Sequence, residues 1–280
     1  MCNPSNRAQK IAESDSLRSH FVRKLVKKPT IPSSDAIAGS IPRLIVQFWN
    51  DFPNVPDDVN NCLDSWRQLE SAGYRRQIFD DGSADAFISD HYSPEHLHAF
   101  RKCYHPAMRS DYFRLCYIYA LGGCYIDADD AYTCTPFDHL FKDGQLKLQP
   151  LCYDCESHSM VDPAEFTDSQ RHSRHWIYYF NNNPIIAGAG HPVVGYALRR
   201  AMQRLLQSID PFPEIQTTTG PGNMTVSVVA RFATTGEGII SLANWGAYSQ
   251  TVWSLSYRRD ERNWRLSNAR PFQSQARYCP

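Results

Sequence analysis

Residues 109–130 read RSDYFRLCYIYALGGCYIDADD, and this stretch decides the fold that the sequence predicts. Its first part predicts a helix that begins after His105-Pro106 and stops at Gly122-Gly123, because glycine ends helices. A short apolar strand, Cys124–Ile126, follows at once and runs into the acidic sequence DADD. A helix leading directly into a buried strand is typical of an α/β protein.

The sequence upstream of this stretch repeats the alternation of strands and helices. Residues 41–49, IPRLIVQFW, form a nearly continuous apolar run, as expected of a buried parallel strand. The other expected elements are a helix from Pro56 to Gly73, a strand at 74–79 that ends in a turn at Asp80-Asp81-Gly82, and a helix capped by Ser93 and started by Pro94.

The second half of the chain gives weaker signals of the same kind. It predicts a strand at Pro184–Ala187, a helix at Val193–Gln207, a turn-rich loop at Thr217–Asn223 that feeds a helix through Phe232, and late strands at Gly238–Leu242 and Thr251–Tyr257. Together these elements predict an α/β fold with one Rossmann-like domain built on a mainly parallel central sheet.

Composition limits the classes of function. Lys and Arg total 29, as do Asp and Glu, so the 280-residue chain has no net charge and lacks the basic excess that broad nucleic-acid binding needs. No apolar run approaches the roughly 20 residues of a transmembrane helix, and the first residues lack the apolar stretch of a signal peptide. We therefore expect a cytoplasmic protein.

The nine cysteines support a reducing compartment, because they are scattered and odd in number. Cys152 and Cys155, followed by three histidines, resemble a zinc site. The last two histidines, His172 and His175, are separated by only two residues, which is short for zinc spacing. An insertion loop near the active site is the favoured interpretation, with zinc as the alternative.

Residues 1–40 differ from the rest of the chain and are predicted to form a basic helical extension to a domain at residues 41–280. Within them, residues 17–28 place apolar side chains on one helical stripe and basic side chains on much of the remainder. Such a helix either packs on the domain or lies on an anionic membrane surface as a peripheral contact. The sequence leaves both open.

Two aspartates directly after the strand carry the predicted chemistry. Ligands of open α/β sheets bind at the carboxyl ends of strands, where Asp127 and Asp129 fall. Side chains two apart on an extended segment project the same way, so these two are expected to point together. Paired carboxylates suit Mg²⁺ or Mn²⁺ bound with substrate phosphates. The alternative is an ordinary strand-end turn in which Asp127 or Asp130 caps backbone amides.

The preceding helix adds Asp111 and Arg114, which are three residues apart and within mutual reach. They form either an intrahelical ion pair or a polar pair beside a metal-bound diphosphate.

Residues 109–130 as a whole resemble the signature of glycosyltransferase family 32. This family includes fungal initiating mannosyltransferases, the glucosyltransferase domains of large clostridial cytotoxins, and bacterial relatives. The shared order is a small residue, Asp, two spacers, Arg, a helix ending Gly-Gly, and then Tyr, an apolar residue, and Asp-x-Asp. Residues 41–49, 182–192 and 219–222 resemble further blocks of the family.

This resemblance implies a GT-A fold and a role for each matching residue. Asp129 is the implied direct metal ligand, with Asp127 beside it contacting ribose and the donor sugar. Asp111 is expected to bind sugar hydroxyls and Arg114 to lie near the sugar and phosphate. The remaining implied donor contacts are Trp49, stacked on the base, and Tyr125, for which burial in the strand is the alternative.

The implied reaction is metal-dependent transfer of a hexose, with retention, from a UDP-sugar or GDP-mannose to a glycan, lipid-linked or protein acceptor. Mn²⁺ or Mg²⁺ is the implied cofactor. Many relatives complete the metal site with a histidine near the C-terminus, but this chain has none after His191. Asn244, Ser249 or Gln250 are the nearest substitutes.

Two other functions remain as alternatives. One is a catalytically weak or inactive relative that binds a nucleotide-sugar or carbohydrate, which the absent histidine favours. The other is a different metal–phosphate enzyme. That reading needs further acidic ligands or a phosphate-binding loop, and the sequence contains no G-x-x-x-x-G-K-[ST] and no G-x-G-x-x-G.

Overall fold

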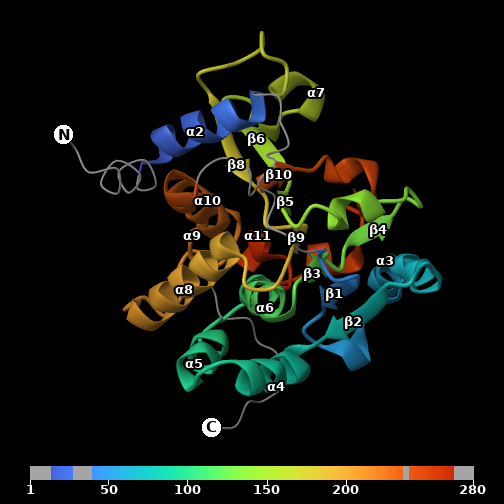
Figure 1. Ribbon diagram of the computed structural model, residues 1–280. Helices are drawn as coiled ribbons and strands as arrows, with labels where there is room; N and C mark the ends of the chain where they lie inside the picture. Colours follow the sequence, from blue (N-terminus) through green and yellow to red (C-terminus); the bar gives the residue numbers. More distant parts are fainter. Residues whose placement is uncertain (1–13, 28–39, 236–239, 268–280) are drawn as a thin grey trace.

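A six-stranded sheet forms the centre of the molecule. The computed structural model describes residues 14–27, 40–235 and 240–267. The strand order across the sheet is β10-β5-β9-β3-β1-β2 (Figure 1). These strands are β1 (Leu44–Phe48), β2 (Arg75–Phe79), β3 (Gly123–Tyr125), β5 (Leu146–Leu148), β9 (Ile185–Ala187) and β10 (Ile240–Leu242).

The sheet is mixed. Strand β1 runs parallel to β2 and β3, and β5 runs parallel to β10. Strand β9 lies between β3 and β5 and is antiparallel to both. The sheet is therefore parallel in five strands and reversed in one, which confirms the expected mainly parallel sheet. The sequence could not say which strand is reversed, since an apolar strand carries no mark of its direction.

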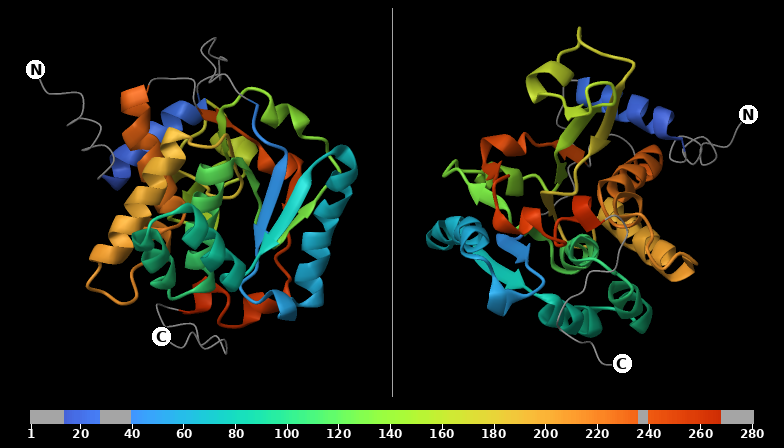
Figure 2. Two further views of the ribbon diagram at one scale, coloured as in Figure 1. Left: turned by 60° about the horizontal axis from the view of Figure 1, so that its bottom comes forward. Right: turned by 180° about the vertical axis from the view of Figure 1, so that it is seen from behind.

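Helices and short 3₁₀ segments cover both faces of this sheet, and the left view of Figure 2 shows β1 and β2 between α3 and α6. The larger core packs α6, α8 and α10 against one face, whereas Trp66, Phe137 and Trp245 belong to the core on the other. The elements are α3 (Asp57–Ser65), α4 (Asp81–His91), α5 (Pro94–Arg101), α6 (Pro106–Leu121), α8 (Pro192–Gln207), α9 (Ile215–Thr218), α10 (Pro221–Thr235), η1 (Phe52–Asn54), η2 (Trp66–Ala72), η3 (Asp138–Phe141) and η4 (Trp245–Ala247).

The junction of α6 and β3 is tight and requires both of its glycines. Gly122 and Gly123 have φ angles of 72° and 109°, in the region that favours glycine. A Cβ on Gly123 would lie 2.7 Å from the Leu44 carbonyl oxygen, and one on Gly122 would lie 2.8 Å from the Ala189 nitrogen. The helix therefore ends directly against β1, and the chain that leaves β3 is held in register with the end of that strand.

Two smaller sheets flank the central one. Strands β6 (Pro150–Asp154), β7 (Ser159–Met160) and β8 (Trp176–Phe180) form an antiparallel sheet in the order β7-β6-β8, with α7 (Pro163–Phe166) between β7 and β8 in sequence. Strand β4 (Asp130–Tyr132) pairs with β11 (Ser249–Thr251). The C-terminal part of the described chain ends with η5 (Ser256–Arg259) and α11 (Trp264–Ser267).

The N-terminal helix α2 (Asp15–Lys27) packs on the rest of the protein, and Figure 1 shows it beside β8 and α10. Val22 is buried, Phe21 meets Phe232 with ring centroids 5.3 Å apart, and the Tyr178 backbone N–H donates to Ser19 Oγ at 3.0 Å. The apolar stripe thus faces the protein, with the exception of Leu17, which is exposed. The idea that this stripe lies on a membrane is wrong for this structure.

Three sequence expectations about local structure also need correction. Asp80-Asp81-Gly82 does not make a turn but begins α4, because the Asp80 carboxylate and the Ser83 hydroxyl form a reciprocal capping box. Of the late strand expected at 251–257, Thr251 alone belongs to a strand, as the last residue of β11, and η5 begins at Ser256. The loop expected at 217–223 contains the end of α9 and the start of α10.

Candidate active site

The two aspartates after β3 both line one cavity, but they sit in a turn. The Asp130 backbone N–H donates to the Asp127 carbonyl oxygen at 3.2 Å, which closes the turn. The extended geometry expected from the sequence is therefore wrong. Asp127 and Asp129 nevertheless both reach the cavity, the first at the end of β3 and the second at the start of β4.

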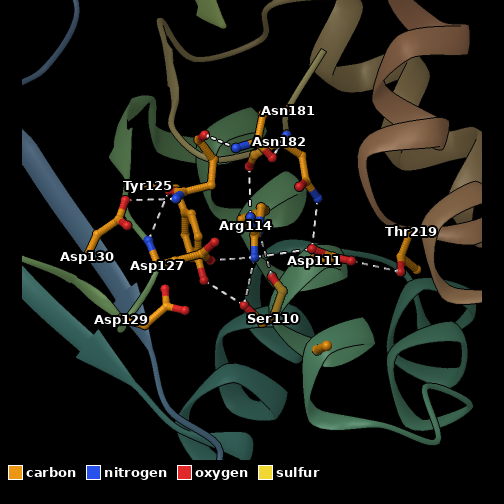
Figure 3. Close-up of polar contacts among 12 residues, drawn as sticks. Ser110, Asp111, Arg114, Tyr125, Asp127, Asp129, Asp130, Asn181, Asn182 and Thr219 are labelled. Atoms are coloured by element: carbon orange, nitrogen blue, oxygen red, sulfur yellow. Dashed lines mark hydrogen bonds and ion pairs between the residues drawn. The ribbon is translucent and has the colours of Figure 1, made fainter. Parts of the chain in front are cut away.

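Arg114 of α6 is the hub of the polar cluster (Figure 3). Its Nη2 lies 2.8 Å from Asp127 Oδ1 and 3.1 Å from Asp111 Oδ1. Its Nη1 donates to the Asn182 carbonyl oxygen at 2.8 Å. Burial alone would lower the pKa of Arg114, but the neighbouring Asp127, Tyr125 and Asp111 raise it, so the guanidinium stays charged. A buried cation between two carboxylates fixes their positions.

Asp111 is buried and receives two further hydrogen bonds. Asn182 Nδ2 donates to its Oδ1 at 2.7 Å, and Thr219 Oγ1 donates to its Oδ2 at 3.3 Å. Burial raises the pKa of Asp111, which the charge of Arg114 and these hydrogen bonds oppose. The ion pair expected from the three-residue spacing is confirmed, and α6 brings it to the cavity wall.

The pKa values of both cavity aspartates, Asp127 and Asp129, are raised. Burial, and next the charge of Asp127, raise the pKa of Asp129 to about 7. Burial raises the pKa of Asp127 to about 6 against the opposing charge of Arg114. A cation between these carboxylates would relieve both the desolvation and the repulsion.

Asp130 is a structural residue. It is completely buried. Its carboxylate accepts hydrogen bonds from Asn183 Nδ2 and Trp245 Nε1, each at 2.9 Å, and from Thr251 Oγ1 at 2.6 Å. Three donors from separate parts of the chain leave this carboxylate engaged, and it ties β4 to β11 and to the second half of the protein.

Trp49 lies at the surface of the cavity, whereas Tyr125 is buried behind it. Trp49 lines the cavity, and no described residue accepts a hydrogen bond from its indole Nε1. Its ring packs edge-on against Tyr257, and Arg262 lies 5.6 Å from its centroid. Tyr125 is completely buried beneath Arg114, 4.1 Å from the ring centroid to Cζ, and shares a 2.6 Å hydrogen bond with Ser110. Tyr125 is therefore not among the residues that line the cavity, and its ring packs against Arg114.

The cavity has a volume of 530 Å³ and two chemically different parts. One part is polar and is lined by Asp111, Arg114, Asp127, Asp129, Asn182 and Asn183. The other is apolar and aromatic and is lined by Leu151, Met160, Val161, Phe166, Tyr179 and Trp264. A ligand that fills both parts would place its charged groups at the end of β3 and its less polar groups against the β6–β8 sheet.

The C-terminal segment supplies residues that the sequence did not identify. Tyr257 donates its hydroxyl to Asp129 Oδ2 at 2.8 Å, and Arg258 forms an ion pair with the same oxygen. Asn244, Ser249 and Gln250, the expected substitutes for the histidine, are not among the cavity-lining residues, and Ser249 is buried in β11. Ser249 and Gln250 belong to β11, which pairs with β4, and Asn244 precedes η4.

Some of the site residues that the sequence analysis did not identify carry a recognisable sequence signal, and others do not. Asn182 and Asn183 follow β8 as part of three consecutive asparagines, an unusual density of amide side chains after a strand. The Asp127 backbone N–H donates to Asn183 Oδ1 at 3.0 Å, so this run could have been recognised. Tyr257 and Arg258 carry no comparable signal.

A divalent metal fits the residues present. Mg²⁺ and Mn²⁺ bind one or two carboxylates together with substrate phosphates, and Asp127 and Asp129 supply two crowded carboxylates at one wall. Within the described ranges, no three His, Cys, Asp or Glu side chains gather to form a complete protein cage. The remaining ligands would therefore be water and the diphosphate of a substrate.

The cysteines and histidines of residues 152–175 do not gather into a group of three or more possible metal ligands in the described structure. Cys152 is buried in β6, while Cys155 is exposed beyond the end of that strand. Burial raises the pKa of the Cys152 thiol to about 12, which disfavours the thiolate that zinc needs. His191 caps α8, where its Nδ1 accepts from the Val193 backbone N–H at 3.3 Å.

Comparison with known proteins assigns the region that contains this site. Residues 56–144 match the family described as "Glycosyltransferase sugar-binding region containing DXD motif". This part of the chain is therefore similar to the DXD-containing region of glycosyltransferases. The matched residues include Asp111, Arg114, Asp127 and Asp129. The DXD motif implies a divalent metal, and the family implies a sugar donor and an acceptor.

The chain is similar in structure to the solved protein named "PaToxG Glycosyltransferase". It is 14% identical in sequence, with a TM-score of 0.47, and the match covers 81% of this chain and 79% of that chain. No curated protein matches the chain. No helix in the described ranges is both long and apolar enough to cross a membrane.

Proposed function

We propose that the protein is a metal-dependent, retaining hexosyltransferase of the GT-A type that uses a UDP-sugar or GDP-mannose as donor. The observation that carries this proposal is the position of Asp127 and Asp129. They follow the central strand β3 and lie in the same cavity as Asp111, Arg114 and Trp49. The carboxyl ends of strands are where open α/β sheets bind nucleotides.

In this proposal each polar residue has a distinct task. Asp129 and Asp127 hold the metal ion, which supplies Lewis-acid stabilisation of the leaving diphosphate. Arg114 fixes the Asp127 carboxylate and contributes positive charge where the diphosphate leaves. Asp111, whose oxygens are oriented by Asn182 and Thr219, binds hydroxyls of the donor sugar.

Trp49 contributes base recognition. Its place on the cavity wall and its unpaired indole N–H suit contact with a nucleotide base, and stacking on an aromatic ring contributes about 1–3 kcal/mol per base.

Retention of configuration is proposed with front-side transfer. The carboxylates of Asp111 and Asp127 are both engaged by Arg114, which reduces their nucleophilicity toward an anomeric carbon. A departing diphosphate oxygen can accept the proton of the acceptor hydroxyl on the same face. Proton NMR of the first-formed product distinguishes this outcome from inversion.

We propose that the acceptor, a glycan, a lipid carrier or a protein, enters along the apolar part of the cavity formed by β6, β7 and β8. Tyr179 lies on this wall, with its hydroxyl 3.6 Å from Met160 Sδ. A sugar or an apolar group attached to it can pack on an aromatic ring at this position.

The release of nucleoside diphosphate from a panel of UDP- and GDP-sugars tests the proposed function. We expect slow release from one donor with Mn²⁺ or Mg²⁺ and none with EDTA. Free phosphate instead of nucleoside diphosphate would indicate a different metal–phosphate enzyme. Absence of both release and calorimetric nucleotide binding would leave the inactive relative as the better description.

A further inference from the structure

The C-terminal segment places a permanent positive charge on the carboxylate to which the metal is assigned. Arg258 Nη2 pairs with Asp129 Oδ2, the oxygen that also accepts the Tyr257 hydroxyl. The side chains of Arg258 and Asp129 are 12% and 15% exposed, so solvent screens this pair weakly. The Val252 backbone N–H donates to the Asp129 carbonyl oxygen at 2.8 Å, which anchors the segment beside the turn.

This contact has a consequence for metal binding. A guanidinium and a divalent cation repel each other, and one carboxylate oxygen cannot serve both at full strength. A metal ion that binds Asp129 must therefore weaken or break the ion pair with Arg258. The freed guanidinium would then need another anion, since an unpaired buried charge is costly.

We propose that Arg258 is a displaceable counter-ion of Asp129, which competes with the divalent metal in the donor-free protein and binds the donor diphosphate once the metal is in place. This inference rests on the proposed function, because it takes Asp129 as the metal ligand and a nucleoside diphosphate as the ligand of the cavity. It assigns Arg258 as a phosphate-binding residue of that site.

The surroundings of Arg258 favour such an exchange. Its guanidinium lies over the ring of Trp253, 4.3 Å from the centroid, and over Tyr257 at 5.5 Å. Stacking holds the plane of a guanidinium while leaving its edge free to exchange partners. Arg258 lines the same cavity as Asp127 and Asp129, and a guanidinium edge matches two phosphate oxygens. The exchange conserves charge, because one ion pair replaces another.

The exchange predicts positive coupling between metal and nucleotide. Metal binding frees the guanidinium for phosphate, and phosphate binding frees Asp129 for metal, so each ligand raises the affinity for the other by the same factor. Removing the guanidinium removes the competition. Metal alone should then bind more tightly, while nucleoside diphosphate should bind more weakly.

Arg262 provides a matched control. It is a second arginine of the same short segment and lines the same cavity, but its guanidinium pairs with Asp260 at 2.6 Å. Arg258→Met and Arg262→Met remove the same charge and keep similar volume. A general electrostatic effect of cavity charge would appear in both variants, whereas release of Asp129 would appear in the first alone.

The experiment is a Mn²⁺ titration of the full-length protein, followed by electron paramagnetic resonance of free Mn²⁺, without nucleotide and then with saturating UDP or GDP. We expect Arg258→Met to bind Mn²⁺ about tenfold more tightly than the wild type without nucleotide, and Arg262→Met to stay within about threefold. Nucleotide should raise Mn²⁺ affinity less in Arg258→Met than in the wild type. Arg258→Lys, which keeps the charge, should retain most of the competition.

Other results overturn the proposal in distinguishable ways. If Arg258→Met keeps wild-type Mn²⁺ affinity with an unchanged melting temperature, Arg258 does not compete for Asp129, although the proposed function stands if the wild type binds Mn²⁺ and nucleotide. An equal gain in Mn²⁺ affinity in Arg258→Met and Arg262→Met would contradict a specific role for Arg258. Failure of every protein, wild type included, to bind nucleotide with Mn²⁺ would overturn the proposed function together with this inference.

Discussion

Two parts of the site are built in different ways. Residues 109–130 supply Asp111, Arg114 and Asp127 from a helix and the strand that follows it, joined by buried hydrogen bonds and by glycines that allow no side chain. Residues 249–267 contact Asp129 through short elements, and the Arg258 guanidinium lies over the exposed ring of Trp253.

Residues 109–130 therefore form a fixed part of the site, whereas the contacts of residues 249–267 can be exchanged for contacts with a ligand. In the first part, Asp111 accepts from Asn182 and Thr219 and shares the buried Arg114 guanidinium with Asp127, so these carboxylates are positioned before any ligand arrives. In the second part, Arg258 and the Tyr257 hydroxyl meet one oxygen of Asp129, and a ligand can replace the ion pair with Arg258. Variants in the first part should therefore damage folding, and variants in the second should change ligand binding.

The largest effect on folding is expected from Arg114→Met. The substitution leaves the carboxylates of Asp111 and Asp127 without their shared cation inside the protein, which should lower the free energy of unfolding by about 3–5 kcal/mol. Urea denaturation measures this loss. The control is Arg67→Met, which removes a surface pair with Asp64 and should cost about 1 kcal/mol or less. Equal losses in the two variants would contradict the view of Arg114 as the hub.

Asp129→Ala should affect turnover more than folding. Loss of the direct metal ligand is expected to lower metal-dependent release of nucleoside diphosphate by about 100-fold, the scale seen when one group that stabilises developing charge is removed. The melting temperature should fall less than in Arg114→Met, because removal of a carboxylate that burial destabilises offsets part of the cost of leaving Arg258 unpaired. Retained activity would show that the metal lies elsewhere.

The neighbouring substitution Asp130→Ala is expected to lower stability more than turnover. The buried donors of Trp245 and Asn183 would lose their acceptor, at about 1–3 kcal/mol for each unpaired group. Unfolding experiments should show a clear loss of stability, with nucleoside diphosphate release changed less than in Asp129→Ala. If Asp130→Ala proved stable and inactive, the assignment of these two aspartates would have to be exchanged.

The pH dependence of stability reports on the crowded carboxylates. Burial raises the pKa of Asp129 to about 7 and of Asp127 to about 6, above the ordinary value of 3.8, so both groups protonate more readily in the folded protein. Their contribution to stability is fully present below about pH 4 and is lost as the pH rises through about 6 to 7. In EDTA, the melting temperature of the wild type should therefore fall from pH 5 to 8 by several degrees more than that of Asp129→Asn. Parallel curves would contradict the raised pKa values.

The smallest expected effect lies at the acceptor wall. Tyr179→Ala removes an aromatic surface from the apolar part of the cavity but no contact to the metal or the donor. Transfer to an identified acceptor should require several-fold more acceptor, a rise in KM, while release of nucleoside diphosphate without acceptor stays the same. An equal effect on both reactions would move Tyr179 to the donor side.

The same contrast explains what the sequence could predict. Local chemistry is concentrated in residues 109–130, where helix ending, strand and aspartates are consecutive, so the main strands, α6 and the pair of Asp111 with Arg114 could all be anticipated. The start of α4 was misread because Asp-Asp-Gly favours a turn unless Ser83 completes the cap of Asp80. The reversed direction of β9 depends on pairing with β3 and β5, which no local pattern records.

The C-terminal contact could not be anticipated for a related reason. Arg258 and Asp129 are far apart in sequence, and an arginine beside a metal ligand is not what a search for oxygen or nitrogen ligands would seek. The expected substitutes Asn244, Ser249 and Gln250 do not line the cavity, and two of them are part of β11, whose pairing with β4 no local pattern records. Tertiary pairing, and not composition, places this half of the site.

The most direct test of the account is a crystal structure with Mn²⁺ and the nucleoside diphosphate that the protein binds, recorded with the anomalous signal of manganese. We predict one manganese peak at the Asp129 carboxylate, bridged to the diphosphate, with the base against Trp49. A manganese ion bound away from Asp127 and Asp129, or a nucleotide outside the cavity at the end of β3, would contradict it.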